Sequence, residues 1–314
     1  MEFLNITEEA EKFLEEWNDS SPYITAHTSG STGSPKPIKL LKTDMTASAE
    51  ATCRFFGIDR GDRLLCPLSA GYIAGKMMIV RAIVADADLI FETPSKKPLK
   101  KDYGRIRLLP IVPSQLAGID VTALRSVDNL LIGGAPLSPE QEKYAAGLPC
   151  RAFASYGMTE TASHIALREI GKEDFFTALP GVGFETDDYG CLKLILPDFS
   201  FRELRTNDTV ELLSDKRFRW IGRKDNVVIS GGLKLHPELI EKKICDHIGA
   251  PFYLIGEDDD EWGQKLVLYV EGPSVPDMEN KLRKILEGVE MPKSIRYVPA
   301  FSRTESGKIK RKLL

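Results

Sequence analysis

The fold is decided by residues 129–157, which read NLLIGGAPLSPEQEKYAAGLPCRAFASYG. Short apolar runs at 129–132 and 151–155 predict two strands, and the more polar segment between them predicts a helix that begins near Ser138. An alternation of strand, helix and strand is typical of an α/β sheet that carries helices on its faces. We therefore expect an α/β architecture whose ligand-binding turns lie where its strands end.

The same alternation extends toward the N-terminus. Helices are predicted at 8–17, 43–56 and 73–85, and strands at 23–28, 38–41, 63–68, 88–91 and 106–112. Thr7 is a suitable N-cap for the first helix, and Gly57 is a suitable stop for the second. Farther along, runs at 191–196, 210–213 and 217–221 indicate antiparallel strands without helices between them.

The end of the chain predicts a separate small α+β domain. Helices are expected there at 237–247 and 275–286, and strands at 251–255 and 265–270. We therefore expect a large N-terminal α/β domain with sheet layers over residues 1–224 and a small, mobile C-terminal domain over residues 225–314. The sequence contains no internal repeat and no low-complexity segment.

Composition excludes several classes of function. The 314 residues are 42% apolar and 28% charged, and the net charge of −4 provides no basic field for nucleic acid. The five cysteines show no Cys-x-x-Cys spacing, so neither a zinc site nor a disulfide framework is expected. The N-terminus lacks the pattern of a signal peptide, and charges at Arg81, Asp86 and Asp88 interrupt the most apolar stretch. We expect no membrane span and a cytoplasmic location.

A loop of small residues joins the strands predicted at 23–28 and 38–41. It reads Thr28-Ser29-Gly30-Ser31-Thr32-Gly33-Ser34-Pro35-Lys36. Glycines let the backbone approach an anion closely, and hydroxyl and amide groups donate hydrogen bonds to it. The loop therefore suits the β- and γ-phosphates of a nucleotide, although it lacks the Gly-Lys-Ser/Thr of a Walker A loop. The alternative is a flexible Ser/Gly linker, but linkers rarely join two strands and end in Pro-Lys.

Two turns follow predicted strands directly. The first, Gly133-Gly134-Ala135-Pro136, leaves room for a flat ring. The second, Ser155-Tyr156-Gly157-Met158-Thr159-Glu160-Thr161, offers a ring to stack on a base, a hydroxyl for a phosphate and a hard oxygen ligand for Mg²⁺. Taken alone, each is better explained as an ordinary turn, the second as a strand-to-helix turn with a capping threonine.

Two charged segments complete the set of candidate motifs. Asp208 of Thr206-Asn207-Asp208 and Arg223 of Gly222-Arg223-Lys224-Asp225-Asn226 suit the hydroxyls of a ribose and a phosphate. Lys308 follows Ser306-Gly307 near the C-terminus, where a lysine on a mobile tail can reach a site on another domain. The ordinary explanations of these segments are a charged turn and a solvated basic tail.

The order of the five segments is more informative than any one of them. From residue 28 to residue 312 the chain resembles the superfamily of acyl-CoA synthetases, adenylation domains and luciferases. These enzymes have a phosphate loop, a Tyr-Gly-Met-Thr-Glu segment, a ribose-binding Asp, a Gly-Arg-x-Asp hinge and a C-terminal Gly-Lys in the same order. The resemblance implies a two-step reaction. A carboxylate attacks the α-phosphate of ATP to give acyl-AMP and pyrophosphate, and a thiol, usually that of coenzyme A, then displaces AMP.

The resemblance also implies roles for individual residues. The nucleotide-binding residues would be Thr28, Ser29, Gly30, Ser31, Thr32, Gly33, Lys36, Gly133, Gly134, Ala135, Tyr156, Gly157, Met158, Thr159, Asp208 and Arg223. Thr159 would contact the α-phosphate, Glu160 would bind Mg²⁺, and Lys308 would bridge the attacking carboxylate and the α-phosphate. Asp225 would be the hinge about which the small domain rotates between the two steps.

Within the superfamily, three segments are most similar to the o-succinylbenzoate–CoA ligases of menaquinone synthesis. They are Val112-Pro113-Ser114-Gln115-Leu116, Gly133-Gly134-Ala135-Pro136-Leu137 and the run from Tyr156 to Ser163. The N-terminus is shorter than is usual, which implies a trimmed fold or completion by an oligomer such as a homodimer.

The acid pocket is predicted less directly. Tyr72 stands where a histidine often lines this pocket in the superfamily. Tyr72, Ser163 and His164 are therefore the candidates for contact with the acid. His164 is equally well explained as an ordinary strand residue.

Three functions stay open at this point. The first is ligation of o-succinylbenzoate to coenzyme A. The second is adenylation of another aromatic or aliphatic acid, with coenzyme A or a carrier protein as acceptor. The third is a non-catalytic relative that binds only a nucleotide or a partner. The presence of Glu160, Asp208, Arg223 and Lys308 argues against the third.

Overall fold

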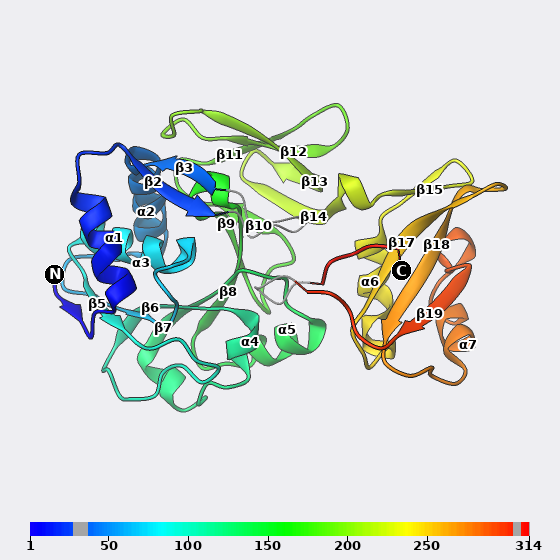
Figure 1. Cartoon of the computed structure of the whole chain (residues 1–314), viewed down its shortest axis with the longest axis horizontal. Coiled ribbons are helices and arrows are strands. Elements are labelled where there is room, and N and C mark those ends of the chain that lie inside the picture. Colours follow the sequence, from blue (N-terminus) through cyan, green and yellow to red (C-terminus); the bar gives the residue numbers. More distant parts are fainter. Residues whose placement is uncertain (28–36, 304–308, 314) are drawn as a thin grey trace. The chain divides into compact units, whose positions relative to one another are not determined.

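The computed structural model describes residues 1–27, 37–303 and 309–313. The chain divides into two compact units (Figure 1). One comprises Met1–Phe184, Leu194–Leu204 and Leu213–Phe218, and the other comprises Glu185–Lys193, Arg205–Leu212 and Arg219–Leu314. We call them the large unit and the small unit.

A mixed β-sheet forms the centre of the large unit. Its strands are β1 (Phe3–Leu4), β5 (Asp88–Phe91), β4 (Arg63–Cys66), β6 (Ile106–Ile111), β7 (Val127–Ile132), β8 (Arg151–Gly157), β9 (His164–Glu169) and β10 (Phe176–Ala178), in this spatial order. The strands from β1 to β8 pair in parallel, and β9 and β10 continue the sheet in antiparallel fashion. The sheet confirms the predicted α/β class.

Helices cover both faces of this sheet. They are α1 (Glu8–Asn18), α2 (Lys42–Phe56), α3 (Ile73–Ala85), α4 (Pro113–Leu116) and α5 (Pro139–Ala146), with the 3₁₀ turns η1 (Ala123–Ser126) and η2 (Thr159–Thr161). On one face, the Phe56 ring of α2 packs edge-on against Phe153 of β8, with centroids 5.2 Å apart. On the other, Leu116 of α4 and Ala145 of α5 join the buried cluster that contains Leu130. Burial on both faces explains why β6 and β7 are apolar almost throughout.

Capping residues mark the starts of α1 and α5 and the end of α2, as the sequence predicts. The Thr7 side chain accepts a hydrogen bond from the Ala10 amide at 3.3 Å and caps α1. Gly57 ends α2 in the left-handed conformation, with φ of 60°. Ser138 caps α5 by accepting a bond from the Gln141 amide at 3.2 Å.

The strands β2 (Tyr23–His27) and β3 (Pro37–Leu41) form a separate antiparallel pair in which His27 lies opposite Pro37. Residues 28–36, the predicted phosphate loop, connect them and lie outside the described residues. The prediction that two strands flank this loop is confirmed. The strands β11 (Gly183–Thr186), β12 (Cys191–Ile195), β13 (Glu203–Ser214) and β14 (Arg217–Arg223) each have residues in both units.

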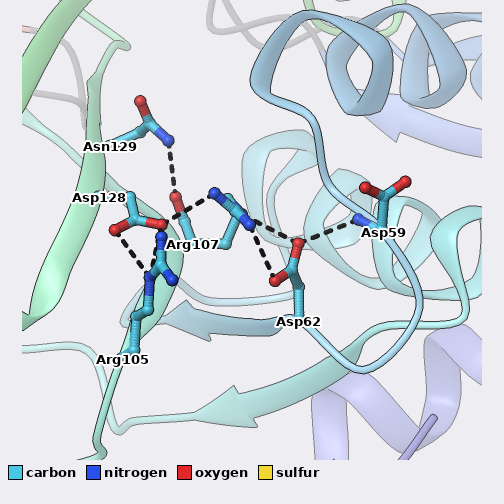
Figure 2. Close-up of polar contacts among 6 residues, drawn as sticks. All are labelled: Asp59, Asp62, Arg105, Arg107, Asp128 and Asn129. Atoms are coloured by element: carbon cyan, nitrogen blue, oxygen red, sulfur yellow. Dashed lines mark hydrogen bonds and ion pairs between the residues drawn. The ribbon is translucent and has the colours of Figure 1, made fainter.

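An ion-pair network fixes the amino ends of three neighbouring parallel strands (Figure 2). Arg107 of β6 donates to both carboxylate oxygens of Asp62, which precedes β4, at 2.9 and 3.2 Å. Arg107 also donates to Asp128 of β7 at 3.0 Å, and Arg105 donates to the same carboxylate at 3.1 Å. The Asn129 side chain donates to the Arg107 carbonyl at 2.9 Å. The network lies at the amino ends of these strands, whereas the candidate site lies at the carboxyl edge of the sheet.

The small unit is built on two long antiparallel strands, β17 (Phe252–Asp259) and β18 (Gly263–Glu271). Its remaining elements are η3 (Lys224–Asn226), β15 (Val228–Ser230), β16 (Leu233–Leu235), α6 (Pro237–Ile244), η4 (Cys245–His247), α7 (Met278–Arg283), η5 (Gly288–Glu290) and β19 (Ser294–Val298). The strand order is β16-β15-β18-β17, and β19 pairs in parallel with β18. Ile240 of α6 and Leu282 of α7 share a buried cluster with Leu268 of β18.

Several predicted boundaries need correction. The helix expected at 275–286 is confined to Met278–Arg283, because Asp277 has a positive φ of 62° and starts the helix there. The helix expected at 237–247 ends at Ile244 and continues only as a 3₁₀ turn. The strand expected at 210–213 is part of the longer β13. The sequence does not predict seven of the strands, because short or mixed-polarity strands carry a weak period-two signal; they are β1, β9, β10, β11, β15, β16 and β19.

We predict that Arg107→Met destabilises the protein by about 1–2 kcal/mol, because Asp62 and Asp128 lose a half-buried partner. Burial alone raises the pKa of Asp62, but hydrogen bonds from Arg107 and from the Asp59 amide lower it below its ordinary value. A lowered carboxyl pKa adds stability above about pH 4, and this stability is lost as the pH falls through the lowered pKa. Urea unfolding should therefore show a loss at about pH 7 that shrinks at about pH 3.

Arg105→Met is the matched control, because the Arg105 side chain is 74% exposed and contacts the same Asp128. We expect it to cost less than about 0.5 kcal/mol. Equal losses in both variants would contradict the importance given to Arg107.

Candidate active site

The carboxyl ends of parallel strands β6, β7 and β8 share one edge of the large unit's sheet (Figure 1). The turn after β7 begins at Gly133, and the turn after β8 runs from Gly157 to Ser163. Open α/β sheets bind ligands at this edge. The structure thus brings two of the predicted motifs to neighbouring strand ends.

Small residues are required in the turn after β7. A Cβ atom on Gly133 would lie 2.5 Å from the Ser155 hydroxyl, which donates to the Ile132 carbonyl at 3.1 Å. Gly134 has a positive φ of 86°, which residues with side chains rarely adopt. Gly133, one of the predicted nucleotide-binding residues, therefore passes closely beside β8.

The turn after β8 is held by its own backbone and by Thr161. A Cβ on Gly157 would lie 2.4 Å from the Ser163 carbonyl oxygen, so the two chain segments touch. The Thr161 hydroxyl accepts from the Met158 amide at 3.2 Å and donates to the Ser163 carbonyl at 2.7 Å. Ala162 completes the turn with a positive φ of 59°, an uncommon conformation for a non-glycine residue. The turn is therefore closed by its own hydrogen bonds, and it contains a 3₁₀ turn at Thr159–Thr161 and not the start of an α-helix.

Side chains of this turn differ in their surroundings. The Tyr156 ring packs against Phe176 and Phe218, with centroids 5.7 and 5.1 Å away. Thr159 is half-buried, and Glu160 is exposed. Within the described ranges, no cation lies within ion-pair distance of the Glu160 carboxylate. The tyrosine is thus fixed by packing, whereas the carboxylate faces solvent.

The three candidates for the acid pocket differ in burial and in their contacts. Tyr72 precedes α3 and is 65% exposed. Ser163 and His164 lie at the start of β9, where the buried His164 ring contacts the Thr52 hydroxyl at 3.2 Å and the Ser163 hydroxyl at 3.2 Å. Burial and the nearby Arg81 charge lower the pKa of His164 well below its ordinary value, so its ring is neutral at neutral pH. His164 is a buried residue at the start of β9.

Sequence reasoning did not assign a role to Arg81. This residue lies on α3, is 2% exposed and donates to the Ser163 hydroxyl at 2.5 Å. The signal in the sequence is that Arg81 is a charged residue inside an otherwise apolar stretch. This signal argues against a membrane span but does not by itself indicate a site. Thr52, which gave no signal, completes the same polar cluster from α2.

The ribose-binding candidates lie in the small unit. Asp208 of β13 is buried and accepts a hydrogen bond from the Trp220 indole at 3.1 Å. The Arg223 guanidinium lies 3.9 Å from the same carboxylate and 2.9 Å from that of Asp225. Asn207 also donates to Asp225, at 3.3 Å. The structure therefore groups Asp208, Arg223 and Asp225, and adds Trp220, whose role one sequence could not indicate.

The segment that contains Lys308 is anchored on both sides. Residues 304–308 lie outside the described residues, but Arg303 and Ile309 form an antiparallel bridge. Farther along, Arg311 donates to both oxygens of the Glu241 carboxylate at 2.8 and 2.7 Å. The Tyr253 hydroxyl donates to the Lys312 carbonyl at 2.7 Å. The basic C-terminus is thus packed on the small unit, which corrects its interpretation as a solvated tail.

Comparison with known proteins decides the family. A model described as AMP-binding enzyme matches residues 3–189. The chain belongs to the AMP-binding enzyme family. Among curated members, the 2-succinylbenzoate–CoA ligase of Listeria monocytogenes serotype 4b is 28% identical, over 98% of this chain and 72% of its own length. The Escherichia coli K12 ligase of the same name is 27% identical, over 78% of this chain and 57% of its own length.

Solved structures of the family share the fold. The acyl-CoA synthetase (AMP-forming)/AMP-acid ligase II-like protein from Dyadobacter fermentans is 33% identical, with a TM-score of 0.66, over 96% of this chain and 91% of that one. The o-succinylbenzoate CoA synthetase from Bacillus subtilis, solved with an acyl-adenylate, has a TM-score of 0.76 at 20% identity, over 91% of this chain and 67% of that one. Across the described part of this chain, no helix combines the length and the apolar character needed to cross a bilayer.

We predict that Gly157→Ala destabilises the protein by about 2–3 kcal/mol, because the added methyl group meets the backbone of Ser163 and His164. Thermal unfolding measures the effect. Gly147→Ala is the matched control at the end of α5, since its Cβ would lie 3.6 Å from the nearest atom, an ordinary contact. A stability of Gly157→Ala equal to that of the control would show that the turn is not closely packed.

Proposed function

We propose that the chain is an AMP-forming acid–CoA ligase that activates o-succinylbenzoate with ATP and transfers the acyl group to coenzyme A. The observation that carries the proposal is the closed turn after β8, which presents Thr159 and the exposed Glu160 at the carboxyl edge of the sheet in a member of the AMP-binding family. The curated ligases similar to this chain over nearly its whole length support the choice of acid. An ATP and magnesium complex of the Bacillus subtilis synthetase, which has the same fold, supports the choice of nucleotide.

The first step joins two anions. A carboxylate oxygen of the acid forms a bond to the α-phosphorus of ATP, and the bond to the pyrophosphate oxygen breaks. No protein nucleophile is needed, so the protein must offset charge and align the two reactants. We assign contact with the α-phosphate to Thr159, the bridge between carboxylate and α-phosphate to Lys308, and contact with the β- and γ-phosphates to residues 28–33. In the second step, the thiolate of coenzyme A attacks the acyl carbon and AMP leaves.

Magnesium enters this reaction with ATP. Among the residues described, no group of three or more His, Cys, Asp or Glu side chains is arranged to hold a metal ion. The Glu160 carboxylate supplies one hard oxygen ligand, which fits the habit of Mg²⁺ to combine one or two carboxylates with phosphate oxygens and water. Glu160 would therefore hold the ion only together with the nucleotide.

We assign the ribose to Asp208 and Arg223 of the small unit. The Asp208 carboxylate accepts from the Trp220 indole, and a carboxylate is a suitable acceptor for ribose hydroxyls. We further propose that residues 225–314 act as a lid that carries Lys308 and turns about Asp225 between the two steps. A moving lid allows two reactions to use one bound intermediate.

A second candidate is ligation of another aromatic or aliphatic acid, to coenzyme A or to a carrier protein. Tyr72 favours it, because this exposed side chain replaces the histidine that superfamily members often place beside the acid. The 33% identical protein from Dyadobacter fermentans is named without any particular acid.

The decisive experiment measures pyrophosphate release with ATP, Mg²⁺ and o-succinylbenzoate, with and without coenzyme A. We expect repeated turnover and a thioester product only when coenzyme A is present. Absence of release with this acid, together with release in a panel of other acids, would favour the second candidate. Absence of release with every acid would reject the ligase.

We predict that Lys308→Ala lowers acyl-AMP formation by about 10³-fold, because the bridge between two anions is lost. Formation of the thioester from supplied acyl-AMP should stay within about threefold of wild type. Lys310→Ala, two residues farther along the same segment, is the matched control and should leave both half-reactions intact. An equal loss of both half-reactions in Lys308→Ala contradicts the role.

We predict that Asp225→Pro slows thioester formation by about tenfold or more and acyl-AMP formation much less, because proline restricts the backbone about which the lid would turn. Asp225→Ala separates this effect from the loss of the contacts with Arg223 and Asn207, since it removes the carboxylate without fixing φ. Single-turnover measurements of each half-reaction provide the comparison. Unchanged thioester turnover in Asp225→Pro would remove this residue as the hinge.

A further inference from the structure

The connection from β5 to β6 crosses the large unit's sheet without a helix. The two strands lie on either side of β4 and are parallel to it, so residues 92–105 pass from the carboxyl end of β5 to the amino end of β6. Such crossovers usually contain an α-helix, which satisfies its own backbone groups. In residues 92–105, all of which the structure describes, there is neither helix nor strand. Side chains must therefore hold this connection in place.

A buried carboxylate is the main anchor of the connection. Glu92 is 7% exposed and accepts hydrogen bonds from the amides of Leu99 and Lys100 at 2.7 and 2.8 Å. The Tyr103 hydroxyl donates to the same carboxylate at 3.0 Å. Hydrogen bonds from three donors to one buried carboxylate fix the backbone around residues 99–103. The side chains that this stretch directs to the surface are thus carried on an ordered loop.

Leu99 adopts a conformation that is uncommon for a residue with a side chain. Its φ is 62°, in the left-handed region, and its side chain is buried in the cluster that contains Leu116 of α4. This conformation is unfavourable for leucine and persists only where the surroundings require it. The next two residues, Lys100 and Lys101, are exposed. The strained turn therefore places a buried leucine directly before two lysines at the surface.

The two lysines line a cavity of about 530 Å³ together with Arg125 of η1. Sites for small molecules usually have volumes of roughly 300–1,000 Å³. Among the described residues, no carboxylate lies within ion-pair distance of Lys100, Lys101 or Arg125. Three like charges around one cavity repel one another, and an anion bound between them relieves this repulsion.

Two carboxylates also line the cavity, and both are engaged in turns of their own. Asp102 accepts a hydrogen bond from the Gly104 amide at 2.8 Å. Asp120 accepts from the amide and the hydroxyl of Thr122, at 2.9 and 2.8 Å. Three cations against two carboxylates leave a net positive charge, and the two exposed lysines at positions 96 and 97 of the same connection increase it. The local field is therefore positive in a chain whose net charge is −4.

We propose that this cavity is a binding site for a phosphate group, held by Lys100, Lys101 and Arg125. A phosphate group carries up to two negative charges and several acceptor oxygens, which suits three cations around one cavity. The guanidinium of Arg125 offers a planar pair of donors, and the lysines add point charges. Because η1 directly precedes β7, the cavity lies toward the amino ends of the strands, away from the candidate active site. The inference does not depend on the proposed ligase function.

Lysine acetylation, measured residue by residue with mass spectrometry, tests the site in the whole chain. Inorganic pyrophosphate represents soluble phosphate esters, and vesicles of phosphatidylglycerol and phosphatidylcholine represent lipid headgroups, both at constant ionic strength. We expect one of these probes to slow acetylation of Lys100 and Lys101 by about threefold or more, compared with sodium chloride or pure phosphatidylcholine vesicles. Lys281 and Lys284, which are exposed at α7, are the internal controls and should react at unchanged rates.

Two arginine variants separate a shared site from a general effect of charge. Arg125→Gln removes the third cation, so the protection of Lys100 and Lys101 should fall by about twofold or more. Arg105→Gln is the matched control, because Arg105 is also exposed but does not line the cavity, and it should leave the protection intact.

The pattern of protection identifies the source of the phosphate group. Protection by pyrophosphate supports a site for a soluble phosphate ester, and protection only by the phosphatidylglycerol vesicles supports a site for a lipid headgroup. Unchanged acetylation with both probes would overturn the proposal. Equal protection of Lys281 and Lys284, or equal losses in Arg125→Gln and Arg105→Gln, would also overturn it, as would protection that Arg125→Gln leaves unchanged.

Discussion

The close approach of Gly157 to the backbone of Ser163 and His164 is the constraint on which the candidate site depends. It forces the chain to reverse within a few residues, so that the parallel strand β8 is followed at once by the antiparallel strand β9. Thr161 closes the turn with two backbone hydrogen bonds, and Ala162 adopts an unfavourable φ to complete it. Glu160 is exposed on this turn and Thr159 is half-buried, while His164 contacts Thr52 of α2 and Ser163 contacts Arg81 of α3.

Two arginines of the large unit differ in their surroundings. At the amino ends of the strands, Arg107 is matched by Asp62 and Asp128, and each partner is only half-buried. Such a network links β4, β6 and β7 and stabilises the fold. Arg81 is buried, has no ion-pair partner among the described residues and donates to the partly exposed Ser163. The first arrangement stabilises the fold, whereas Nε of Arg81 has no hydrogen-bond partner among the described residues.

The small unit holds the ends of the segment that contains Lys308. Arg311 pairs with Glu241, whose pKa burial raises to about 7 in spite of the opposing effect of Arg311. Arg303 pairs with Glu271 at 2.8 Å on the other side of the segment. These contacts fix both ends of residues 304–308 relative to the core of the small unit.

The sequence by itself determined the α/β class, most helices and parallel strands of the large unit, and the family. These features follow from local signals: apolar periodicity, Thr7 and Ser138 as caps, Gly57 as a stop, and motifs whose order is preserved in the chain. It also marked the residues of the turn after β8, because a turn at a strand end is read from neighbouring residues. It could not show that Ser163 and His164 meet Arg81 and Thr52, or that Trp220 orients Asp208. Only the tertiary structure decided these contacts, because they join residues that are far apart in the chain and become neighbours only when strands and helices pack together.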